Sequence, residues 1–129
     1  MTGFVDNIET LTTENSDFRR VIYTGEHLQL VLMSLEPGQD IGSEVHAEHD
    51  QFFRIESGEG EVVIDGARSK VKDDDAIIVP AGAQHNVINT GKEPLRLYTL
   101  YGPPEHKEAT VHEDKDDVEE EHFDGETTE

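Results

Sequence analysis

The sequence lacks cysteine and tryptophan altogether and is poor in basic residues. Without cysteine, neither disulfide bonds nor thiolate ligands are available, so nitrogen and oxygen atoms must hold any bound metal. No apolar run approaches the length of a membrane span. The first residues contain neither the basic region nor the apolar stretch of a signal peptide. We therefore expect a cytoplasmic protein with no membrane partner.

Positive charge is scarce throughout the chain, which has 129 residues with 10 Lys and Arg against 30 Asp and Glu, a formal net charge of −20. Such a charge repels phosphate groups, so nucleic acid is not an expected partner. Acids are dense in residues 113–129, but further clusters lie at 56–61 and 73–75. This spread favours adaptation to molar salt, where repulsion is screened, over the alternative of a tolerant fold with an acidic tail.

The chain length suits one domain, and the pattern divides it into three parts. Residues 1–19 are predicted to form an extended arm that packs on the domain or on a neighbouring subunit. Residues 20–104 show short strands separated by turns, which is typical of a sandwich or barrel. Residues 105–129 form an acidic tail that is predicted to be largely disordered, because it buries too little apolar surface.

The predicted strands are short and regularly spaced. Asp65-Gly66 is a strong signal for a two-residue hairpin turn between two of them. No longer helical pattern interrupts this part of the chain. The expected strands span residues 21–24, 27–34, 44–46, 51–56, 61–64, 69–71, 76–79, 85–89 and 95–101.

Two segments carry residues suited to metal chemistry. Glu44 and His46 are two positions apart, so on a strand both side chains point to the same face. His85 follows the turn Pro80-Ala-Gly, which is expected to start another strand. Imidazole and carboxylate groups that share one space are the ligands of a divalent first-row metal. The sequence therefore predicts a metal site inside a small all-β domain.

The first of these segments resembles the first motif of the cupin superfamily. That motif holds two histidines, a glutamate and a later glycine at fixed spacing. Gly58 lies seven positions after Gln51, which places Gln51 where the family has its glutamate. By the same spacing His46 takes the place of the second histidine and Glu44 that of the first.

The second segment is similar to the second cupin motif, which reads glycine, Pro-x-Gly, histidine and asparagine. Here it reads Pro80-Ala81-Gly82, His85 and Asn89, with Asp74 in place of the opening glycine. The chain thus resembles small single-domain cupins that are grouped with mannose-6-phosphate isomerase-like proteins. The resemblance implies a double-stranded β-helix, or jelly-roll barrel, over residues 20–104.

The resemblance also implies a ligand set of Glu44, His46, Gln51 and His85 for zinc, manganese, iron or nickel. Two points stay open. Gln51 is either a weak ligand or a neighbour that supports Glu44 or a bound water. His49 is an alternative to Glu44, but it breaks the family spacing, and its ring would point to the strand face opposite that of His46.

For the function, three classes remain. The first is a small-molecule metalloenzyme, either isomerase-like, with Glu44 acting as a base, or an iron-dependent dioxygenase. The second is a barrel that binds a small ligand without turnover, and in the third a metal only stabilises the fold. Tyr101 shares a face with Leu97 and Thr99, as a candidate proton donor or pocket wall. The basic residues, Arg19 among them, are expected to face mostly outward, which argues against a sugar phosphate.

Small cupins commonly pair as dimers, and sheet edges of this kind need cover. We therefore expect a homodimer, with the arm of residues 1–19 contributing to its interface.

Overall fold

Buried and partly exposed residues alternate along the strands, and this alternation builds the interior. On β9 (Leu95–Gly102), Leu95, Leu97, Thr99 and Tyr101 are buried, while the residues between them are partly exposed. Such a period of two directs alternate side chains to one face of a sheet. The same pattern on β4 (Asp50–Ser57), which contains the strand predicted over residues 51–56, buries Gln51, Phe53 and Ile55.

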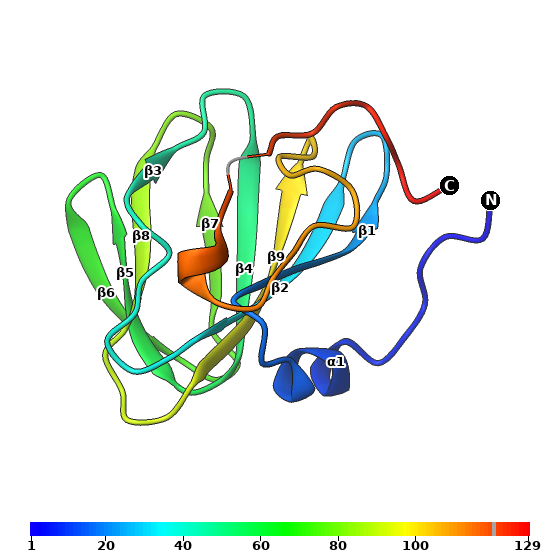
Figure 1. Cartoon of the computed structure of the whole chain (residues 1–129). Helices are drawn as coiled ribbons and strands as arrows, with labels where there is room; N and C mark the ends of the chain where they lie inside the picture. Colours follow the sequence, from blue (N-terminus) through cyan, green and yellow to red (C-terminus); the bar gives the residue numbers. More distant parts are fainter. Residues whose placement is uncertain (120) are drawn as a thin grey trace.

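The computed structural model describes residues 1–119 and 121–129. Two antiparallel sheets face one another (Figure 1), which confirms the predicted all-β, jelly-roll class of fold. The larger sheet has the order β10 (Val111–His112), β1 (Arg19–Thr24), β2 (Gln29–Leu35), β9, β4 and β7 (Ala76–Val79). The smaller sheet has the order β3 (Glu44–Val45), β8 (Gln84–Asn89), β5 (Glu59–Ile64) and β6 (Ala67–Lys72).

The space between the sheets holds the hydrophobic core. Phe53 and Leu97 of the larger sheet and Val87 of the smaller one are fully buried there. The turn between β5 and β6 is the predicted one, since Asp65 and Gly66 both have positive φ angles, of 47° and 83°. This geometry matches the right-handed twist of the two strands.

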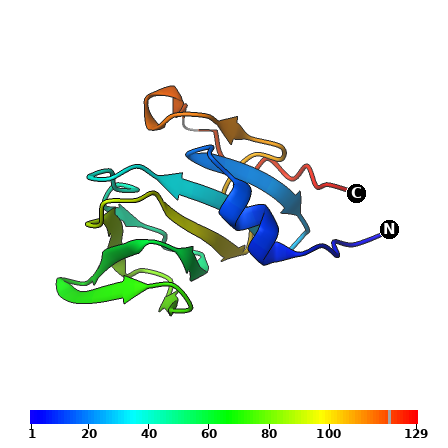
Figure 2. The same cartoon turned by 90° about the horizontal axis from the view of Figure 1, so that it is seen from below.

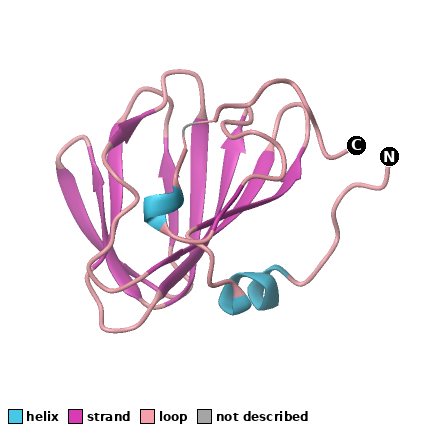
Figure 3. Cartoon of the chain, viewed as in Figure 1, coloured by secondary structure: helices cyan, strands magenta, loops and turns pink. Residues whose placement is uncertain are grey.

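The sequence predicts an extended N-terminal arm, but the arm is only partly extended. It contains the short helix α1 (Ile8–Glu14), which begins where the Asn7 side chain accepts a hydrogen bond from the Thr10 amide at 2.9 Å. This cap satisfies a backbone donor that the first turn leaves free. The helix packs against β2, β4 and β9 below the sheets (Figure 3), and Arg96 donates to the Thr13 carbonyl at 2.7 Å.

The acidic tail also differs from its expected disorder, because its described residues lie against the domain. Strand β10 pairs with β1, and the amides of Phe18 and Val21 donate to the carbonyls of Glu113 and Thr110. The tail therefore covers backbone groups at the sheet edge that would otherwise lack partners. It continues through the 3-10 turn η1 (Lys115–Asp117), and Val118 packs against the core. Figure 2 shows β10 beside β1.

Among the described residues, no helix is long and apolar enough to cross a membrane.

The contact of the tail with the core can be tested by Val118→Asp. We expect this change to lower the free energy of unfolding by about 1 kcal/mol, since it removes a partly buried apolar side chain. Chemical denaturation would measure the effect. Val5→Asp is the matched control, because Val5 is 96% exposed and its substitution should be silent. Equal stability of both variants would show that the tail does not pack as described.

Candidate metal centre

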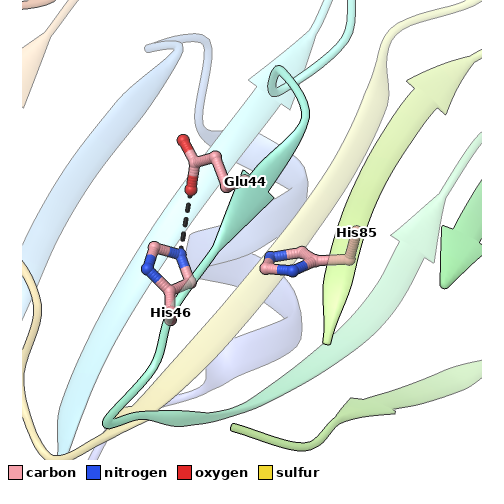
Figure 4. A group of neighbouring side chains, drawn as sticks. All are labelled: Glu44, His46 and His85. Atoms are coloured by element: carbon pink, nitrogen blue, oxygen red, sulfur yellow. Dashed lines mark ion pairs between the residues drawn. The ribbon is translucent and has the colours of Figure 1, made fainter. Parts of the chain in front are cut away.

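The pairing of β3 with β8 brings three predicted ligands together. Glu44 lies opposite His85 in this register, and His46 follows directly after β3. One ligand atom from each of the three residues lies within 4.8 Å of those of the other two. Figure 4 shows the two imidazole rings and the carboxylate converging from neighbouring strands. The spacing observed in the sequence thus places a carboxylate and two imidazoles around one point.

His85 is oriented by the backbone. Its Nδ1 lies 3.1 Å from the Ala83 carbonyl oxygen, which can only accept a hydrogen bond, so Nδ1 carries the proton. Burial lowers the pKa of His85 and thereby favours the neutral ring. Its Nε2 then carries a lone pair. This atom is buried and has no hydrogen-bond partner among the described residues. A buried nitrogen without a partner is costly, and a metal ion would satisfy it.

Glu44 and His46 form the charged half of the centre. His46 Nε2 lies 2.9 Å from Glu44 Oε2. The adjacent carboxylate raises the pKa of His46. Burial opposes ionisation of Glu44, but the adjacent His46, together with the charge of Arg19, lowers the pKa of Glu44 overall. The two groups are close enough to bind one metal ion, which would displace any proton on the facing atoms, because ligands bind metals in their deprotonated forms.

His49 is engaged elsewhere. Its Nδ1 lies 2.6 Å from the Pro103 carbonyl oxygen and its Nε2 lies 2.7 Å from Glu105 Oε2. Both ring nitrogens therefore face oxygen acceptors, which leaves neither lone pair for a metal. Of the two arrangements left open by the sequence, this geometry favours Glu44 over His49.

Gln51 lies inside the same end of the domain, opposite Tyr101 in the sheet. It is 3% exposed, and its Nε2 donates to Thr99 Oγ1 at 3.0 Å. Its Oε1 is buried without a hydrogen-bond partner in the described part of the chain. This oxygen is available as a weak ligand or as an acceptor for a ligand-bound water.

Tyr101 supports His46 from the side. Its ring meets the His46 ring edge-on with centroids 5.7 Å apart, and its hydroxyl lies 3.2 Å from His106 Nε2. Burial raises the pKa of Tyr101 well above its ordinary value, so the hydroxyl keeps its proton. At 3% exposure, the side chain is better placed to position His46 than to reach a ligand in the pocket.

Three residues near the centre escape the sequence analysis. Arg19 was expected to face outward, but it is buried beside the site. Glu105 contacts His49 and also accepts from His122 at 3.2 Å, and His106 contacts Tyr101. A signal for Arg19 was available, because it is two positions before the inward-facing Val21 on the same strand. Glu105 and His106 lie in the tail, and because the sequence predicts disorder there, it predicts no role for them at the site.

A pocket of about 470 Å³ is lined by two of the three ligand groups, Glu44 and His46. This volume suits a small-molecule ligand. Its walls come from the start of β1, the segment before and within β3, and the tail. The lining residues are Phe18, Arg19, Ile41, Gly42, Ser43, Glu44, Val45, His46, Glu105, His106, Lys115, Val118, Glu119, Glu121 and His122.

Comparison with known proteins supports the same architecture. Residues 31–101 match the family described as Cupin domain. An uncharacterized protein of Bacillus subtilis, YrkC, is 51% identical over 121 residues, which cover 89% of this chain and 65% of that protein. A protein of Acanthamoeba polyphaga mimivirus, L612, is 41% identical and covers 84% of this chain and 70% of its own. This chain thus spans about two thirds of the length of these relatives.

Solved structures agree. A crystal structure of a Bacillus halodurans protein has a TM-score of 0.88 and 48% identity, and it covers 90% of this chain and 92% of its own.

A more distant relative by sequence is the mannose-1-phosphate guanylyltransferase of Escherichia coli. It is 29% identical over 76 residues, which are 59% of this chain but only 16% of that enzyme.

The partly buried imidazole of His106 gives a pH dependence of stability. Burial lowers the pKa of His106 far below its ordinary value, so the folded state keeps it neutral while the unfolded state takes up a proton below about pH 6.5. Its contribution is therefore complete above this pH and is lost as the pH falls. When the pH is lowered from about 7 to about 5, the unfolding free energy of the wild type should fall by about 1 to 2 kcal/mol more than that of His106→Gln.

Chemical denaturation at several pH values would measure this difference. His27→Gln is the control, because the His27 side chain is 90% exposed and its removal should leave the pH dependence unchanged. Identical pH profiles for wild type and His106→Gln would contradict the predicted role of burial.

Proposed function

Because this chain belongs to the cupin family, we propose that it binds one divalent metal ion through Glu44, His46 and His85 and acts on a small molecule in the adjoining pocket. The observation that carries the proposal is the orientation of His85. Its Nδ1 donates to a backbone carbonyl, so its buried Nε2 lone pair faces the carboxylate and the second imidazole. Such second-atom hydrogen bonds are a regular feature of histidine ligands.

The ligand set of two imidazoles and one carboxylate suits iron, manganese, zinc or nickel. When bound, such a metal would polarise an oxygen atom of the ligand or, in the case of iron, support oxygenase chemistry. We favour an isomerase-like proton transfer in which Glu44 changes from ligand to base, because its carboxylate is ionised and about one third exposed toward the pocket. Tyr101 keeps its proton and holds the His46 ring in place.

Elemental analysis after reconstitution with each of the four metals would test the site. We expect near-equimolar metal in the wild type, and its loss in His85→Ala and His46→Ala, since each variant removes a direct ligand. His49→Ala is the matched control, because both of its ring nitrogens are already engaged, and it should retain the metal. A wild-type protein that takes up no metal, or a His85→Ala protein that keeps the metal, would contradict the proposal.

The preferred metal also separates the two enzymatic alternatives. Iron that is retained in preference to the others would direct assays toward oxygenase substrates, whereas zinc or manganese would direct them toward isomerisation.

Gln51 supports the centre in this proposal. Gln51→Leu should weaken metal affinity by about tenfold to a hundredfold, the usual effect of removing a supporting neighbour. Competition with a chelator of known affinity would measure it. A loss as complete as that of His85→Ala would instead identify Gln51 as a direct ligand, and an unchanged affinity would exclude both roles.

A further inference from the structure

Arg19 is a buried cation in the pocket that metal binding does not require. It is 6% exposed and lines the pocket together with Glu44 and His46. Its position is fixed from the tail side, where its Nη1 lies 3.4 Å from His112 Nδ1. Its guanidinium carbon also lies 5.3 Å from the centroid of the Phe18 ring. These contacts orient the guanidinium but do not neutralise it.

Arg19 differs from three more exposed arginines in its pairing. Arg20, Arg54 and Arg68 each form an ion pair with a carboxylate. Arg19 forms none with the described residues, and its Nε is buried without a hydrogen-bond partner among them. An unpaired buried charge is costly. A planar fork of donors of this kind matches the two oxygens of a carboxylate.

We propose that Arg19 anchors a carboxylate of the small molecule whose other oxygen atoms reach the metal centre. This inference rests on the proposed metal-binding function and adds the class of ligand. The ligand is a hydroxy or keto acid with a second carboxylate. One end meets Glu44, His46 and His85, and the other meets Arg19.

The charges of the pocket favour a carboxylate over a phosphate. Glu105, Glu119 and Glu121 also line the pocket. Lys115, the other basic side chain in its described lining besides the histidines, is already paired with Asp40. A doubly charged phosphate would face these acids with one available cation, whereas a carboxylate carries a single charge that Arg19 can balance.

Calorimetric titration of the manganese-loaded protein would test the inference. Malate and 2-hydroxybutyrate both present a hydroxy acid to the metal, but only malate has a second carboxylate. The dicarboxylate 2-hydroxyglutarate is one carbon longer than malate. We expect at least one of the two dicarboxylates to bind the wild type about tenfold more tightly than 2-hydroxybutyrate, as a charge-assisted hydrogen bond would give. This preference should disappear in Arg19→Gln.

Arg20→Gln is the matched control. It removes the same charge from the neighbouring position, where the side chain is 52% exposed and pairs with Asp17, and it should keep the preference. Metal content, measured on each variant, should not change. Should Arg19→Gln fail to fold, Arg19→Lys serves as the test variant. Lysine lacks the planar fork of donors, so this change should lower the preference for the dicarboxylate by about threefold or more.

Several outcomes would overturn the inference. With metal bound normally, the absence of any preference for a second carboxylate would overturn it and leave the metal site standing. So would a preference that survives in Arg19→Gln, or displacement of the bound dicarboxylate by an equal concentration of inorganic phosphate. Failure of the wild type to take up manganese or any of the other metals would overturn the metal proposal, and this inference with it.

Discussion

The metal centre depends on the register between two short stretches of backbone. Strand β3 has only two residues, yet its pairing sets Glu44 opposite His85. A slip of one residue would turn Glu44 to the other face of the sheet. Hydrogen bonds on both sides of β3 hold this register, from the Ile41 amide to the Val87 carbonyl and from the Gly82 amide to the His46 carbonyl. The turn that begins at Pro80 therefore both delivers His85 and fixes the segment that carries the other two ligand groups.

Much of this arrangement could be predicted from the sequence, because a period of two determines which side chains share a face. The strands and the common face of Gln51, Phe53 and Ile55 are local consequences of that rule. The Asp65-Gly66 turn is equally local, because these two residue types favour the positive φ angles of a tight hairpin. The close approach of His85 to Glu44 is not local. It followed from the resemblance to cupins, whose motifs span both segments.

The remaining features depend on contacts that composition does not encode. The acidic composition of the tail predicts disorder, but the tail is ordered by pairing with the edge of β1, which lies some ninety residues earlier in the chain. Arg19 is an exception, because its inward orientation follows locally from the alternation that it shares with Val21 on β1. The commitment of His49 to Pro103 and Glu105 likewise joins distant segments. The homodimer, the cytoplasmic location and the adaptation to salt stay predictions.

The metal ligands and the outer wall of the pocket come from different parts of the chain. Glu44, His46 and His85 belong to the two-sheet domain, whereas Glu105, Val118 and Glu121 belong to the segment that follows it. Mutations of Val118 or Glu121 would reshape the cavity without changing a ligand residue, whereas Glu105 lies 3.8 Å from His46 Nδ1 and is tied to the centre. Divergence among relatives could therefore change which molecule is accepted while the metal and its chemistry are inherited unchanged, so selectivity and reactivity are free to evolve at separate rates.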